Sequence, residues 1–179
     1  MARNATWTNN DGLVVGFGQR DSLNDNGATV RTQGNVEVLS MVFDLVNSLP
    51  AAAGTAPSSK SIPIPANSFI HSATLRVITA ATSAGATTLS LGLKNSAGTV
   101  IDADGIDATI AKTAIDAIGD TVQCDGALVN GLVTVGTADA YISSVVATGP
   151  YTAGEVELTI EYSKPLPDVT PTDPITTEI

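Results

Sequence analysis

Three aspartates that lie close together in the sequence have the side-chain type that binds calcium. Asp102, Asp104 and Asp107 belong to the segment DADGID, in which Gly105 follows the second aspartate. An EF-hand loop has acidic residues at alternate positions, Gly after the third of them and a closing Glu, so this segment does not fit it. A calcium site of another kind, in a loop between strands, is the alternative to a solvated acidic loop. We prefer the solvated loop.

The one cysteine and the one histidine of the chain are candidates for nucleophilic or metal chemistry. Cys124 and His71 lie about 50 residues apart. A catalytic thiol needs a His base, but a buried cysteine more often only packs in the core. A zinc site needs more ligands than one His without a Cys pair. We therefore expect no metal and no Cys–His nucleophile, and we expect His71 to be a buried or an interface residue.

Glu155, Glu157 and Glu161 lie on one face of a predicted strand, and paired carboxylates can hydrolyse glycosides. A glycosidase cleft usually has stacking aromatic residues, and this chain has only seven aromatic residues. An outward strand face that is charged for solubility explains these glutamates better. The sequence contains no Gly-rich phosphate loop after a strand. It therefore predicts a protein that is not an enzyme and has no cofactor.

Charge and hydropathy exclude two further classes of partner. The formal net charge is −10, and no two of the eight basic residues are adjacent. Such a surface repels phosphate, so we expect no direct binding of nucleic acid. No run approaches the ~18 apolar residues of a membrane span, and the first residues lack the apolar core of a secretory signal. We therefore expect a soluble protein that is made in the cytoplasm, without a membrane partner.

The elements that would position these side chains are strands, because apolar residues alternate at period two. The segment 66–95 predicts two neighbouring antiparallel strands joined by the small-residue loop 80–86. Phe69, Ala73, Leu75 and Val77 share the apolar face of the first strand; the second has Leu89, Leu91 and Leu93. The clearest alternation in the chain is Glu155–Tyr162, with Val156, Leu158, Ile160 and Tyr162 facing inward.

Turn signals divide the rest of the chain into further short strands. Residues 35–46 predict a strand buried on both faces or a short helix, and their β-branched residues favour the strand. We expect additional strands at 99–101, 128–135 and 141–147, and one helical turn within 108–118. Seven to nine short strands are typical of an all-β fold, here an antiparallel β-sandwich or jelly roll.

The two ends of the sequence differ from this central domain in composition. Residues 1–33 are polar and predict an N-terminal arm, residues 34–163 the sandwich, and residues 164–179 an extended C-terminal tail rich in Pro and Thr. Trp7 is the single tryptophan, and a large aromatic residue in a polar arm either folds back on the domain or anchors the arm in a partner subunit. We expect the interface residues to be Trp7, Leu13, Phe17, Pro165, Pro167, Pro171 and Pro174.

The pattern over residues 60–162 resembles the small β-sandwich virion proteins of tailed bacteriophages. The similarity involves packing and turn patterns rather than a functional motif. The segments that carry it are Ile62–Ile70, Leu75–Ala80 with the small-residue loop that follows, Leu89–Leu93, Thr113–Asp116 and Thr152–Tyr162.

The resemblance implies a non-enzymatic viral structural protein, namely a capsid decoration or cement protein that stabilises the phage head by bridging major capsid subunits. It also implies a homo-oligomer, with a trimer as the expected form, on the capsid surface of the virion. Arms that become ordered on binding can cover a large area, and many copies on a lattice add avidity. The alternative, from another class, is a glycan- or host-binding fibre or adhesin module with a calcium-dependent site near 102–125.

Overall fold

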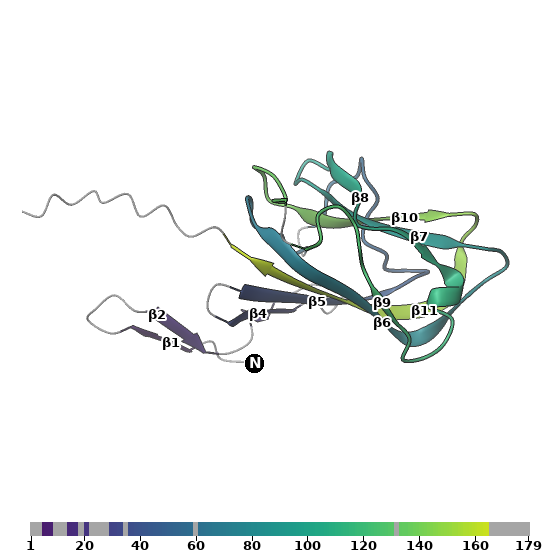
Figure 1. The fold of residues 1–179 in the computed structure, drawn as a ribbon, viewed down its shortest axis with the longest axis horizontal. Helices are drawn as coiled ribbons and strands as arrows, with labels where there is room; N and C mark the ends of the chain where they lie inside the picture. The colour runs from purple at the N-terminus through teal and green to yellow at the C-terminus, as the bar shows by residue number, and fades with distance from the viewer. Residues whose placement is uncertain are drawn as a thin grey trace, which may run out of the picture.

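The computed structural model of the 179-residue chain describes residues 36–58, 61–130 and 133–164 in full, and before them the backbone of four strands. Strands form two antiparallel sheets that pack face to face (Figure 1). Within the described residues, the single helical element is the 3₁₀ turn η1 (Lys112–Ala114), as expected for 108–118. None of these residues belongs to a helix long and apolar enough to cross a membrane.

The larger sheet has six strands in the order β3-β4-β5-β11-β6-β9. Each neighbouring pair is antiparallel, and β11 lies between β5 and β6 along most of its length. The strands are β3 (Arg20–Asp21), β4 (Thr29–Gln33), β5 (Val36–Asp44), β6 (Phe69–Ser83), β9 (Thr121–Gln123) and β11 (Tyr151–Ser163).

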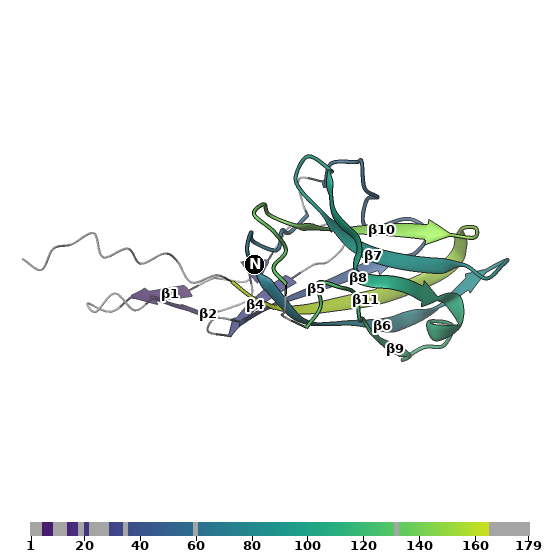
Figure 2. The same ribbon diagram turned by 45° about the horizontal axis from the view of Figure 1, so that its top comes forward.

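The smaller sheet has three strands in the order β10-β7-β8, and Figure 2 shows them stacked on the larger sheet. They are β7 (Thr88–Lys94), β8 (Val100–Ala111) and β10 (Tyr141–Ala147). A separate antiparallel pair, β1 (Ala5–Thr8) and β2 (Val14–Phe17), precedes the sandwich. The expected all-β sandwich is therefore confirmed.

One apolar core fills the space between the two sheets. Leu158 on β11 and Leu91 on β7 are both 0% exposed, and they belong to the same cluster of buried side chains. Period-two alternation puts every second residue of these strands on the inner face, as the sequence predicts. Each fully buried aliphatic side chain contributes about 1.5–3 kcal/mol to folding. The same alternation in β5 shows that residues 36–44 form a strand rather than a helix.

The prediction that residues 66–95 form a hairpin is wrong. The two strands exist, but β6 belongs to the larger sheet and β7 to the smaller one. The small-residue loop therefore crosses from one sheet to the other instead of joining neighbours. Two strands that each have one apolar face can bury those faces against each other across a sandwich. Alternation does not distinguish this arrangement from a hairpin.

A register shift in β6 changes the predicted faces at its beginning. Between the pairs Tyr162↔Ile70 and Glu161↔Ser72 the register moves by one residue, so Ile70 and Ala73 are both buried. Such a bulge reverses the alternation on one side of it. Phe69 is 37% exposed and does not share the inner face of Ala73, and His71 is exposed rather than buried.

Two further strand predictions differ from the structure. No named strand covers the described part of 128–135, where residues 127–130 form a turn and Thr134 makes only an isolated bridge to Phe69. The predicted strand at 99–101 continues to Ala111 as β8, although it contains irregular pairing with β7. Its many aspartates obscured this continuation, because acidic residues are uncommon in strands.

Candidate functional site

The aspartates Asp102, Asp104 and Asp107 lie in strand β8 and not in a solvated loop, so that expectation is wrong. Asp107 is only 5% exposed, and its carboxylate accepts a 3.0 Å hydrogen bond from the amide of Thr109. Burial raises the pKa values of both Asp107 and Asp102. Among the residues that the structure describes, no three His, Cys, Asp or Glu side chains are grouped so that they could hold a metal ion.

The thiol of Cys124 is buried and 2% exposed. Desolvation raises its pKa to about 12, and the carboxylates of Asp107 and Asp125 add to the shift. The group is therefore a neutral thiol at pH 7, and only the thiolate is an effective nucleophile. His71 is exposed on β6, and no hydrogen bond joins it to Cys124 in the described part of the chain. The geometry gives no Cys–His pair.

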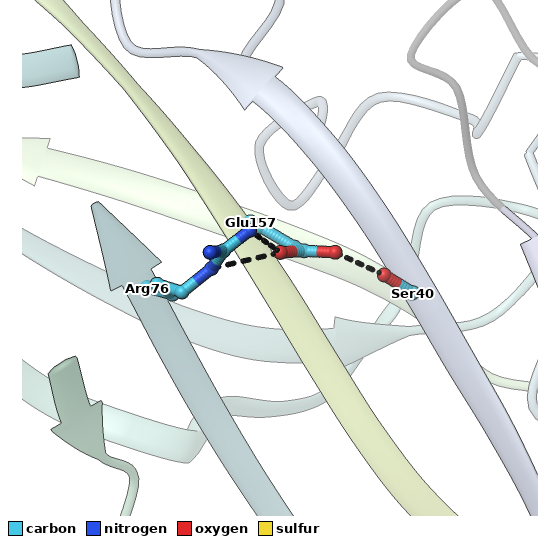
Figure 3. Close-up of polar contacts among 3 residues, drawn as sticks. All are labelled: Ser40, Arg76 and Glu157. Carbon is cyan, nitrogen blue, oxygen red and sulfur yellow. Dashed lines mark hydrogen bonds and ion pairs between the residues drawn. The ribbon is translucent and has the colours of Figure 1, made fainter. Parts of the chain in front are cut away.

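Glu157 lies on the outer face of the larger sheet, where it joins three strands (Figure 3). Its carboxylate accepts hydrogen bonds from Ser40 on β5, at 2.9 Å, and from Arg76 on β6, at 2.7 and 3.1 Å. The hydrogen bond from Arg76, followed by that from Ser40, lowers the pKa of Glu157. An ionised carboxylate held by a guanidinium is a poor general acid, so this side chain fits cross-strand pairing rather than glycoside hydrolysis.

A second carboxylate, Glu37, is buried where the larger sheet meets the beginning of the C-terminal segment. Its inward position on β5 follows from the alternation that buries Leu39. Tyr162 donates a 2.7 Å hydrogen bond to one oxygen of Glu37, and Lys164 lies 2.6 Å from the other. A buried carboxylate needs such partners. The contact between Glu37 and Lys164 therefore holds Lys164, the last residue that the structure describes, against the core.

Exposed apolar side chains gather at this same end of the sheet. Val36 and Phe69 are each 37% exposed, and both are register partners of Ser163 on β11, which separates them. Each precedes a buried residue, Glu37 or Ile70, so both lie on the outer face. Together they form an apolar outer edge beside the point where the chain leaves the larger sheet at the end of β11.

Most of the predicted interface residues lie outside the described side chains. Trp7 pairs with Val15 in the β1–β2 hairpin, and Phe17 pairs with Ala5, but only their backbone is described. Leu13, Pro165, Pro167, Pro171 and Pro174 lie outside the described residues. The division of the chain at residue 33 stays a prediction. Five residues of the expected arm, Thr29–Gln33, form β4 and pair with β5.

A buried lysine that was not predicted from the sequence, Lys94, lies at the end of β7. Its side chain is 0% exposed, and its ammonium donates hydrogen bonds to the carbonyls of Ala51 at 2.6 Å, Ala52 at 3.2 Å and Thr55 at 2.8 Å. Desolvation lowers the pKa of Lys94. No carboxylate among the described residues pairs with it. The sequence does contain one indication of this burial. Lys94 directly follows Leu91-Gly92-Leu93, and a residue that continues a buried strand lies close to the core.

Lys94 also lines a groove between β5, β10 and the loop that follows β5. The groove has a volume of about 400 Å³. Its apolar lining includes Leu39 and Met41 from β5, Ile142 from β10, and Leu49 and Ile62 from the ends of the loop. Asn47, Ser48, Ser58 and Ser61 add hydrogen-bonding groups. A mainly apolar lining with a few hydrogen-bonding side chains is typical of a binding groove.

No protein-family model and no curated protein matches the sequence. A chain of the acidic stable capsid structure of Helicobacter pylori bacteriophage KHP30 is similar, with a TM-score of 0.50 and 13% identity over 75% of this chain and 92% of that chain. A chain of the cyanophage Pam1 capsid asymmetric unit matches with a TM-score of 0.49 and 16% identity, over 75% of this chain and 91% of that one. A chain from the capsid of Ralstonia phage GP4 matches with a TM-score of 0.48 and 19% identity, over 73% of this chain and 86% of that one. The KHP30 similarity shows a shared fold.

Proposed function

We propose that this protein is a non-enzymatic structural component of a bacteriophage virion, and specifically a capsid decoration protein. Its partner would be the major capsid protein, whose neighbouring subunits it bridges on the outer surface of the head. The proposal includes a homo-oligomer, with a trimer as its expected form. The N-terminal segment carrying Trp7, Leu13 and Phe17 and the proline-rich tail would make the contacts to neighbours.

The observation that carries this proposal is the fold shared with a chain of the KHP30 capsid. The match covers 75% of 179 residues, about 134, and these make up 92% of that chain, which therefore has about 146 residues. The sandwich of this protein thus corresponds to nearly the whole of a small capsid chain rather than to one domain of a large one.

The position of the apolar outer edge supports a docking role at the same end. Val36 and Phe69 are exposed beside Ser163, where the chain leaves the larger sheet. Contacts made by the proline-rich tail would therefore be continuous with contacts made by the sheet. An aromatic side chain that loses its remaining exposure in an interface is a typical binding anchor.

The direct test is quantitative mass spectrometry of purified phage particles. We expect this protein at a fixed ratio to the major capsid protein, as a lattice component requires. Its absence from particles would overturn the proposal.

A second experiment compares Phe69→Asp with Val145→Asp, an exposed residue of β10 with a similar accessibility of 44%. We expect Phe69→Asp to lower the occupancy of the capsid and Val145→Asp to leave it unchanged, with both variants folded by circular dichroism. Equal occupancy for the two variants would contradict a contact through the apolar outer edge.

A further inference from the structure

The groove beside Lys94 has the composition of a site for an extended peptide segment. Leu39, Met41 and Ile142 supply apolar contacts at its base, and the unbranched Met41 adapts to irregular shapes. Asn47 and Ser58 lie at its exposed rim. An extended segment has no internal backbone hydrogen bonds, so it needs such side chains as partners. A volume of about 400 Å³ accommodates a few side chains and not a folded domain.

A positive charge also lies buried beside the groove. The ammonium of Lys94 is bound to three neutral carbonyls, and no described carboxylate pairs with it. A buried charge of this kind favours a ligand that brings a negative charge near it. The ligand that fits is therefore extended, apolar at intervals and acidic.

The C-terminal segment of this chain has this combination. Residues 165–179 read PLPDVTPTDPITTEI, with four prolines, three acidic residues and isolated Leu, Val and Ile side chains. Proline restricts the backbone to extended conformations and lowers the entropy lost on binding. We propose that the groove of one copy binds residues 165–179 of a second copy, with Ile175 as the apolar anchor and Asp173 directed toward Lys94.

The geometry of the last described residues favours a second copy over the same one. Lys164 is held by Glu37, and β11 runs antiparallel to β5, so the chain leaves the sheet in the direction away from Leu39 and the groove. Pro165 and Pro167 each fix φ near −65° and restrict the residue before them, which opposes an immediate reversal.

The segment is also long enough to reach a neighbour. Fifteen residues at ~3.1 Å each span roughly 46 Å, whereas a domain of about 130 residues is roughly 36 Å across by the usual scaling. This inference rests on the homo-oligomer of the proposed function but not on the capsid. According to this inference, the neighbour that the C-terminal segment binds is another copy of this chain.

Cross-linking of the full chain tests two things together, namely that residues 165–179 bind in the groove and that the groove belongs to a second copy. A photoreactive p-benzoylphenylalanine replaces Ile175, and equal amounts of light and ¹⁵N-labelled protein are mixed, irradiated and analysed by mass spectrometry. We expect cross-links to groove residues such as Leu49 and Ile62, many of them between a light and a heavy copy. Cross-links only within one copy, or only to residues outside the groove, would overturn the proposal.

Sedimentation analysis of full-length variants gives an independent measure. We expect Leu49→Glu in the groove and Ile175→Asp in the tail each to weaken self-association at least about 10-fold, whereas Val145→Asp changes it less than about 2-fold. If Leu49→Glu lowers the melting temperature, Ile175→Asp carries the test, because residue 175 lies outside the described core. Unchanged self-association in Ile175→Asp contradicts the inference. Because the assay contains no capsid, its outcome is independent of whether the protein occurs in virions.

Discussion

The phenol of Tyr162 donates a 2.7 Å hydrogen bond to Glu37, so the last inward side chain of β11 holds a carboxylate at the edge of the core. Lys164 completes the arrangement at 2.6 Å, with 34% of its side chain exposed against 7% for Glu37. Removing one partner of a buried charge weakens the interactions that offset its desolvation, which lowers the stability of the fold. The cluster therefore ties the beginning of the C-terminal segment to the fold.

The first prediction concerns this cluster. We expect Lys164→Ala to lower the free energy of unfolding by about 1–3 kcal/mol, toward the lower end because Lys164 is partly solvated. Urea titration followed by circular dichroism measures this change. The control is Arg76→Ala, which breaks the more exposed pair with Glu157 and should cost less than about 1 kcal/mol. A smaller effect for Lys164→Ala than for Arg76→Ala would contradict the prediction.

The second prediction concerns Lys94 as the support of the loop after β5. Lys94→Met keeps the length of the side chain but removes the ammonium that donates to three carbonyls, of which, within the described residues, only that of Ala52 also accepts from the amide of Thr55. We therefore expect the free energy of unfolding to fall by about 2–4 kcal/mol. Hydrogen exchange should also become faster at residues 51–55, whose carbonyls lose the contact. Lys112→Met, at the beginning of η1, is the matched control. Unchanged exchange in the loop would show that Lys94 does not hold it.

The third prediction is a dependence of stability on pH. In the folded protein the pKa of Glu157 lies below its usual value of 4.5, mainly because Arg76 donates hydrogen bonds to the carboxylate. Below about pH 4.5 the unfolded chain takes up this proton more readily, so stability falls as the pH drops through the folded pKa. We expect Glu157→Gln to lose less free energy of unfolding between pH 5 and pH 3 than the unmodified protein, by up to about 1 kcal/mol. Glu155→Gln is the control for charge alone, and an equal reduction of the loss in that variant would contradict the assignment.

The fourth prediction compares two glycines. A Cβ on Gly92 would lie 2.3 Å from backbone atoms of Ala103 and Asp102 on β8, whereas at Gly85 the nearest atom is the Thr148 carbonyl oxygen at 3.5 Å. Backbone cannot move aside as a side chain can, so we expect Gly92→Ala to cost at least about 3 kcal/mol. Gly85→Ala should change stability by less than about 1 kcal/mol. Thermal melts of both variants measure the difference, and equal melting temperatures would be the contrary result.

The fifth prediction separates a structural protein from a calcium-dependent binding module. Asp102, Asp104 and Asp107 lie along strand β8 and form no metal cluster with the other described residues. We therefore expect millimolar calcium to leave the melting temperature unchanged, since a ligand that binds only the folded state would raise it. A rise that disappears in Asp102→Asn would favour the binding module instead.

The strands with regular alternation were predictable from the sequence, because burial of one face leaves a direct pattern. β10 was predicted with its observed ends, and Val156, Leu158, Ile160 and Tyr162 of β11 all point into the core. The partner of each strand was not predictable, since β6 and β7 look the same whether they pair in one sheet or face each other. The bulge that turns Phe69 outward arises from the pairing of β6 with β11, so the residues of β6 alone do not indicate it.

The polar residues of the interior were harder to place than its apolar ones. Glu37 occupies the same face as Leu39, Met41 and Phe43, so the alternation of β5 does indicate its burial. Its partner Lys164 lies 127 positions away, and the sequence alone does not connect the two. The groove beside Lys94 likewise joins segments from three parts of the chain. Such sites arise from tertiary contacts, which residue type and spacing do not determine.

The central place of β11 in the larger sheet has a consequence for biosynthesis. Its neighbours β5 and β6 precede it in the chain, and 106 residues separate Asp44 from Tyr151. At ~5–20 residues per second, a ribosome needs about 5–20 s to produce this interval. During that time β5 and β6 have emerged with unpaired edges and uncovered apolar faces, so the nascent chain passes through an aggregation-prone stage. The larger sheet then closes by insertion of its middle strand, not by growth from one side.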